Sequence, residues 1–268
     1  MKKVLITAGP TNEYIDEVMK ITNMSTGRLG VELSKNYLRE GCEVFLICTR
    51  SVARGGLYEK YGLKDKSKLH TIQIETTDDM YNALEKVSKE ENIDLVIHAA
   101  AVGDYKPAFS FKMEDMAQEI FDNLQKDMSV ETILKTLTNP QCKVNDDTKI
   151  SSYEQNLTVK LGLTTKLISH LKEWFPKSKL VGFKLLENVT RDHLIEVAQK
   201  LCIKNDMDYI IANDLHDLRG GKHISYLVNK DGYQNCEFHS PEDIYRKTSS
   251  FLKEEREKGE IIDISNIK

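Results

Sequence analysis

The sequence predicts an α/β fold, with a mostly parallel, doubly wound sheet between two layers of helices. Short apolar runs of strand length alternate with amphipathic segments of helix length along most of the chain. The first run, Val4–Thr7, leads through a polar loop to a helix opened by Ser25, Thr26 and Gly27. A later run, Asp94–His98, ends in small residues that allow close packing against the backbone. Together these patterns indicate a three-layer, Rossmann-like α/β/α architecture.

The first half of the chain carries the clearest alternation. Apolar and β-branched runs predict strands, and apolar side chains three or four residues apart predict helices. A glycine is expected to end the first helix. The expected strands are Val4–Thr7, Glu43–Cys48, Thr71–Ile74 and Asp94–His98, and the expected helices run from Arg28 to Gly41 and from Thr77 to Val87.

The alternation is interrupted at about residues 108–155 and then resumes. We expect one domain over residues 1–268, with a helical or flap insertion in that interval and a C-terminal β-hairpin around Lys230–Gly232. Thr190 and Ser240-Pro241 are expected to begin helices. The expected helices are Phe111–Leu137 (as one or two), Thr164–Phe175, Thr190–Asn205 and one after Pro241; the expected strands are Asn156–Leu161, Lys179–Lys184, Tyr209–Ala212, Ile224–Asn229 and Tyr233–His239.

Composition excludes several classes of function. The net charge of −4 argues against a nucleic-acid surface, which needs a basic excess or stripe. The sequence contains no signal-peptide core and no apolar stretch of membrane-spanning length, so we expect no membrane partner. The five cysteines form no C-x-x-C pair, which predicts reduced thiols and a cytoplasmic protein.

The loop Ala8–Gly27 is the first candidate binding element. Loops longer than about 12–15 residues are usually functional or disordered, and the apolar residues in this loop suggest packing against the rest of the protein. A simple solvated loop is the alternative. Gly27 at a helix start favours an anion, because backbone N–H groups there are unpaired. The polar clusters Asn23–Gly30, Asp104–Lys106 and Asn213-Asp214 follow predicted strands, whose ends meet at one edge of a doubly wound sheet.

Other chemistries find little support in the sequence. The seven histidines show no H-x-x-x-H spacing, and no His, Cys and carboxylate cluster has the spacing of metal ligands. His98 is expected to be a hydrogen-bonded core histidine. There is no G-x-S-x-G elbow and no Walker lysine loop.

Six motifs in register resemble one family. They are Ala8-Gly-Pro-Thr, Ile21-Thr-Asn-Met-Ser-Thr-Gly, Ala99-Ala-Ala-Val-Gly-Asp-Tyr, Lys149-Ile-Ser-Ser, Gly182-Phe-Lys-Leu and Ala212-Asn-Asp-Leu. The chain resembles phosphopantothenate–cysteine ligase, the second activity of the bifunctional coenzyme A biosynthesis flavoprotein, from about residue 3 to about residue 255. It has no flavin-dependent decarboxylase half, so it looks like the monofunctional bacterial form of that ligase.

The resemblance implies a two-step ligation in coenzyme A biosynthesis. The carboxylate of 4′-phosphopantothenate attacks the α-phosphate of CTP, with Mg²⁺ present, and pyrophosphate leaves. The amine of L-cysteine then attacks the acyl-cytidylate, and CMP leaves as 4′-phospho-N-pantothenoylcysteine forms. Eukaryotic relatives use ATP, and the family implies a homodimer.

The resemblance also assigns roles to residues. Gly9, Ser25, Thr26, Gly27 and Gly30 match the phosphate loop, where Thr26 replaces a second serine. In the substrate region, Asn23 matches the asparagine at the pantothenate carboxylate and acyl intermediate, and Ala100 and Ala101 match small residues lining the pantothenate site. In the nucleotide region, Asp104 matches the aspartate near the nucleotide and its cation. Phe183 and Asn213 match positions around the base and ribose.

Lys149 matches the first lysine of a mobile segment that closes over the triphosphate. A lysine there can neutralise charge developing on the leaving pyrophosphate. Bifunctional relatives carry K-I-K-K at this point, whereas this chain has Lys149-Ile-Ser-Ser152, so two positive charges are missing.

Two other functions remain open at this level. An NAD(P)-dependent oxidoreductase can use the same type of sheet, but no glycine fingerprint directly follows the first strand. A non-catalytic nucleotide-binding module can keep the phosphate loop, although it does not need Asn23 and Lys149. Pyrophosphate release and a change in nicotinamide absorbance separate these possibilities.

Overall fold

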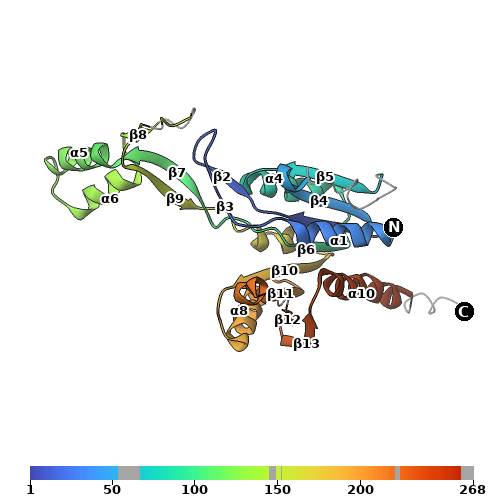
Figure 1. Ribbon diagram of the computed structural model, residues 1–268. Helices are drawn as coiled ribbons and strands as arrows, with labels where there is room; N and C mark the ends of the chain where they lie inside the picture. Colours follow the sequence, from blue (N-terminus) through green and yellow to red (C-terminus); the bar gives the residue numbers. More distant parts are fainter. Residues whose placement is uncertain (54–66, 145–148, 152, 221–223, 261–268) are drawn as a thin grey trace, which may run out of the picture. The chain divides into compact units, whose positions relative to one another are not determined.

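The computed structural model describes residues 1–53, 67–144, 149–151, 153–220 and 224–260. The chain forms two compact units (Figure 1). The first comprises Met1–Thr11, Met24–Ala101 and Lys166–Lys268, and the second comprises Asn12–Asn23 and Val102–Thr165. The insertion expected at about residues 108–155 lies within the Val102–Thr165 part of the second unit.

An eight-stranded sheet organises the first unit. Its order is β13-β12-β11-β10-β6-β1-β4-β5, and every pair from β11 to β5 is parallel. The two last strands add an antiparallel hairpin, as expected. The strands are β1 (Lys3–Ala8), β4 (Glu43–Thr49), β5 (Leu69–Ile74), β6 (Leu95–His98), β10 (Lys179–Leu186), β11 (Tyr209–Asp214), β12 (Ser225–Asn229) and β13 (Gly232–Phe238).

Helices cover both faces of this sheet, which confirms the predicted three-layer α/β/α class. On one face α1 and α10 pack together, and the Tyr37 hydroxyl lies 2.6 Å from that of Thr248. On the other face α4 packs beside β4 and β5, and α8 beside β11 and β12. The helices are α1 (Arg28–Arg39), α2 (Arg50–Ala53), α4 (Thr77–Glu90), α7 (Leu171–Trp174), α8 (Arg191–Lys204), α9 (Leu215–Arg219) and α10 (Pro241–Glu260), with a 3-10 turn η1 (Leu167–Ser169).

Local capping signals set several helix boundaries correctly. The Thr190 side chain accepts a hydrogen bond from the His193 N–H at the start of α8, and the Ser240 hydroxyl accepts one from the Asp243 N–H at the start of α10. Gly41, which follows α1, has φ +86°, a backbone conformation that glycine adopts without strain. The single helix predicted over Thr164–Phe175 was wrong, because only the short η1 and α7 form there.

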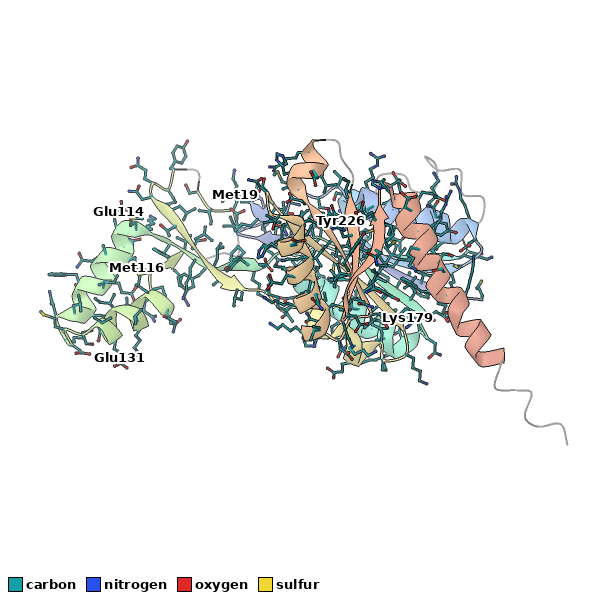
Figure 2. The ribbon with its side chains drawn as sticks, turned by 90° about the horizontal axis from the view of Figure 1, so that it is seen from below. Met19, Glu114, Met116, Glu131, Lys179 and Tyr226 are labelled. Atoms are coloured by element: carbon teal, nitrogen blue, oxygen red, sulfur yellow. The ribbon has the colours of Figure 1, made fainter. Side chains whose placement is uncertain are left out.

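The second unit contains two small antiparallel sheets and two helices. A hairpin of β2 (Asn12–Tyr14) and β3 (Lys20–Thr22) lies within the loop expected between the first strand and its helix. The other sheet has the order β8-β7-β9, from Lys143–Val144, Tyr105–Lys112 and Leu157–Leu163. Figure 2 labels Glu114 and Met116 on α5 (Met113–Leu124) and Glu131 on α6 (Val130–Thr138).

The predicted helical segment Phe111–Leu137 begins too early. Phe111 belongs to strand β7, and the first helix begins only at Met113. Phe109 and Phe111 lie two residues apart, which is the spacing of a strand. Pro107 nevertheless argues against a strand in the sequence, because proline cannot donate a backbone hydrogen bond to a neighbouring strand. The register with β9 shifts between Pro107 and Phe109, and this bulge accommodates the proline.

Within the described residues, no helix is long and apolar enough to cross a bilayer. The five cysteines are all free thiols, and burial raises the pKa of Cys48 to about 12. Cys48 is fully buried and packs in the apolar core.

Candidate functional site

Three glycines, of which the first is distant in sequence from the other two, come together at the carboxyl end of β1. Gly9 follows the strand, Gly27 precedes α1, and Gly30 lies on the first turn of α1. Gly9 and Gly27 both have positive φ, +82° and +70°, and a Cβ at either would lie 2.6 Å from Val52 Cγ2. The three positions therefore match the needs of a dinucleotide fingerprint, a tight turn and a close helix–strand contact, although a long excursion separates the first from the others.

The amino terminus of α1 is suited to an anion. Gly27 begins the helix in the left-handed conformation, and within the described residues no side chain caps it and no acid lies in its first turn. The hydroxyl of Ser25 lies 3.4 Å from the Gly27 nitrogen, and that of Thr26 lies 3.4 Å from the Arg28 nitrogen. Both hydroxyls thus lie at the positive end of the helix dipole, where a phosphate would bind.

Gly30 tests how tightly this helix must approach the strand. We expect Gly30→Ala to lower the free energy of unfolding by about 1–3 kcal/mol, because overpacking a close contact costs that much. The added Cβ would lie 2.5 Å from Ala8 Cβ and 3.3 Å from the Thr7 carbonyl oxygen, and neither can rotate away. Denaturant unfolding measures the loss. Gly162→Ala is the control, since its Cβ meets Ala108 at an ordinary 3.8 Å; equal stability of both variants would contradict the prediction.

The end of β6 lies directly beside Gly9. Pro10 and Ala101 form a parallel bridge, in which the Ala101 N–H donates to the Gly9 carbonyl at 2.9 Å and the Thr11 N–H donates to the Ala101 carbonyl at 3.4 Å. Ala100 and Ala101 are half-buried. The structure thus brings Gly9 of the predicted phosphate loop and the two predicted substrate-lining alanines together beyond the carboxyl ends of the neighbouring strands β1 and β6.

Two buried side chains, Thr7 and His98, hold the backbone at the carboxyl end of β6. The Thr7 hydroxyl accepts from the Ala100 N–H at 3.1 Å and lies 2.9 Å from His98 Nδ1. His98 is 8% exposed, and burial lowers its pKa to about 4. The imidazole is therefore neutral at pH 7, which confirms the expectation of a hydrogen-bonded core histidine.

His98 should make folding stability sensitive to mild acid. Its pKa is about 4 in the folded state, against an ordinary value of 6.5, so the unfolded chain binds the proton more readily between these values. Stability is therefore complete above pH 6.5 and falls as the pH drops toward 4, by up to about 3 kcal/mol. Chemical unfolding at pH 7 and pH 5 measures this fall. In His98→Gln the difference between the two pH values should shrink, and an unchanged difference would rule out His98 as its source.

Phe183 and Asn213 lie farther along the same edge of the first unit. Gly182 on β10 pairs with His98 on β6, so Phe183 follows just beyond the end of β6. Asn213 on β11 pairs with Leu185, and both candidate residues are half-buried. Because β6, β10 and β11 are parallel, their carboxyl ends share one edge with the glycine cluster.

Asp214, which belongs to the predicted Asn213-Asp214 cluster but was given no individual role, fixes the end of β11. Its carboxylate accepts hydrogen bonds from the backbone N–H groups of Asn188, Val189 and His216 at 2.7–2.9 Å. These bonds, with that from Val189 largest, lower the pKa of Asp214. The carboxylate therefore holds the backbone next to Asn213 in place.

The remaining candidates, Asn23, Asp104 and Lys149, belong to the second unit. Asn23 is exposed, and its amide donates to the Val102 carbonyl at 3.1 Å. Asp104 is also exposed, and its backbone carbonyl accepts from the Thr164 N–H at 3.1 Å. Lys149 is exposed next to buried Ile150. Residues 145–148 and Ser152, parts of the polar stretch and of the Lys149-Ile-Ser-Ser motif, lie outside the described residues.

The donor set fits a cation that is shared with phosphates rather than a closed metal site. Among the described residues, no three His, Cys, Asp or Glu side chains are grouped as metal ligands. Mg²⁺ commonly binds through one or two carboxylates together with substrate phosphates and water. The exposed carboxylate of Asp104 is suited to be one such ligand.

Comparison with known proteins identifies relatives over most of the chain. The family described as "DNA/pantothenate metabolism flavoprotein C-terminal domain" matches residues 1–139. The coenzyme A biosynthesis bifunctional protein CoaBC of Thermococcus kodakarensis is 30% identical over 230 residues, 86% of this chain and 45% of that protein. The chain thus spans about half the length of the curated relatives it matches.

Two solved structures are also similar to this chain. The DNA/pantothenate metabolism flavoprotein from Streptococcus pneumoniae has a TM-score of 0.73 and 31% identity, covering 94% of this chain and 99% of its own. A Cab2 mutant in complex with phosphopantothenate-cysteine shares the fold, with a TM-score of 0.62 and 19% identity over 95% of this chain and 89% of its own.

Proposed function

The chain belongs to the family of the DNA/pantothenate metabolism flavoprotein C-terminal domain, and from this premise we propose that it is a phosphopantothenate–cysteine ligase in coenzyme A biosynthesis. The observation that carries the proposal is the glycine-lined start of α1 beside Ala100 and Ala101. An anion site next to small residues suits a phosphorylated substrate and a nucleotide. The Cab2 mutant, solved in complex with phosphopantothenate-cysteine, supports the same substrate class.

The proposed reaction has two steps. A carboxylate oxygen of 4′-phosphopantothenate attacks the α-phosphorus of CTP, and the bond to the pyrophosphate breaks. The amine of L-cysteine then attacks the acyl carbon, loses a proton, and displaces CMP to leave an amide. Mg²⁺ supplies charge neutralisation on the triphosphate, and Asp104 is its proposed protein ligand.

We assign the residues to these steps as follows. The helix start at Ser25–Gly30 and Gly9 bind phosphate, and Phe183 and Asn213 contact the base and ribose. Ala100 and Ala101 leave space for the pantothenate. The uncharged amide of Asn23 stabilises the oxyanion without trapping the substrate carboxylate, and Lys149 neutralises the leaving pyrophosphate.

Pyrophosphate release from purified protein tests the function. The protein is given 4′-phosphopantothenate, cysteine and Mg²⁺, with CTP and ATP in separate reactions, and the cysteine adduct is sought by mass spectrometry. We expect release with CTP alone. Release with ATP would keep the ligase but overturn the choice of nucleotide, and no release with either would favour a binding module.

We also propose that the protein works as a homodimer. The family resemblance motivates this, because Ala100 and Ala101 match residues near a subunit interface. Light scattering at working concentration measures the mass, and a monomer would overturn the proposal.

A further inference from the structure

A buried carboxylate shapes the turn between β2 and β3. Asp16 is only 4% exposed. Its Oδ1 accepts from the backbone N–H groups of Val18 at 2.7 Å and Met19 at 2.6 Å, and Figure 2 labels Met19 at this hairpin. The Ile15 N–H donates to the Met19 carbonyl at 2.9 Å and closes the turn. One oxygen of Asp16 is thus committed to local structure.

The other oxygen of Asp16 reaches a distant part of the second unit. Its Oδ2 accepts from the Ile150 N–H at 3.0 Å, across 134 residues of sequence. Ile150 is itself only 6% exposed, so both ends of this bond are shielded from water. The bond fixes the backbone immediately after Lys149, whose side chain is exposed.

The chemistry of the contact requires a carboxylate. Hydrogen bonds from backbone N–H groups, that from Met19 first, hold the pKa of Asp16 below its usual range, and the charge of Lys149 contributes in the same direction. An asparagine can still accept at the turn with its one oxygen, but it then presents an NH₂ group to the Ile150 N–H. Two donors facing each other leave the Ile150 amide unpaired.

We propose that Asp16 is a positioning residue for Lys149: through the Ile150 amide it anchors the segment that presents the lysine ammonium. This rests on the proposed function of Lys149 at the leaving pyrophosphate. A cation on a long, flexible side chain acts best when its backbone is already fixed, since less ordering is then left to the reaction. Local sequence patterns do not reveal this link, because its partners are distant along the chain.

Hydrogen exchange tests the anchor without reference to activity. In protein labelled with ¹⁵N-isoleucine, we expect Asp16→Asn to speed exchange of the Ile150 amide by about tenfold. Asp16→Ser serves as a second variant, because its hydroxyl can keep the turn while no oxygen remains for Ile150. Glu17→Gln is the matched control, since it removes an exposed carboxylate from the same turn. Unchanged exchange at Ile150 in folded Asp16 variants would overturn the anchor.

Pyrophosphate release then tests the coupling to Lys149. We expect Asp16→Asn to slow release about tenfold in the presence of Lys149, but to leave the rate of Lys149→Gln unchanged. Additive losses in the double variant would overturn positioning and indicate a general structural effect. If wild-type protein releases no pyrophosphate, the proposed function fails, and the Ile150 exchange result still decides whether Asp16 anchors the segment.

Discussion

Asn23→Asp is expected to fold normally and to lose at least about a hundredfold in the rate of ligation, the effect typical of removing one donor from an oxyanion site. Asn23 is exposed, so the isosteric change disturbs no core. The new carboxylate would repel the substrate carboxylate and could no longer donate to the Val102 carbonyl, 3.1 Å from the present amide. Formation of the cysteine adduct under saturating substrates measures the loss.

A matched control separates this effect from added charge. Asn92→Asp makes the same substitution at an exposed position between α4 and β6. It should retain wild-type turnover, and both variants should unfold at nearly the same denaturant concentration. Wild-type turnover by Asn23→Asp would remove Asn23 from the mechanism.

Local sequence signals were sufficient for most of the first unit. The central strands β1, β4 and β6 are buried on both faces, so each reads as an unbroken apolar run. Helix starts at Thr190 and Ser240 follow from side chains that bond to nearby N–H groups. These interactions span only a few residues, which is why a single sequence reveals them.

The second unit depends on pairings that a single sequence hides. Strand β7 pairs with β9, from Tyr105 opposite Leu163 to Lys112 opposite Leu157. The bulge near Pro107 obscures the alternation of side chains that would reveal β7 in the sequence. The Asp16–Ile150 bond is equally non-local. Sequence patterns could suggest polar loops here, but they could not say which residues hold one another.

The candidate site divides in the same way. Gly27 was predictable from the physics of a helix start, whereas Gly30 was assigned only by resemblance to a family, and the approach of Gly9 to both depends on the fold of the intervening residues. The roles of Asn23 and Lys149 came only from resemblance to a family. Both side chains are exposed, so no pattern of burial in a single sequence reveals their chemistry.

Lys149→Gln is expected to slow pyrophosphate release by about a hundredfold, because an ammonium that neutralises a leaving group acts mainly in the transition state. Glutamine keeps a polar side chain, one bond shorter than that of lysine, but carries no charge. The neighbouring Ile150 amide should stay bonded to Asp16, so the loss arises from the side chain rather than from the backbone. Stopped-flow detection of pyrophosphate measures the first step before cysteine is added.

Two further variants make this prediction specific to charge at one position. Lys126→Gln removes an exposed lysine from the same unit and should release pyrophosphate at the wild-type rate. Lys149→Arg keeps the charge on a differently shaped group and should fall between wild type and Lys149→Gln. Unchanged release in Lys149→Gln would contradict the leaving-group role. An equal loss in both Lys149 variants would instead mean that ammonium geometry, rather than charge alone, stabilises the departing pyrophosphate.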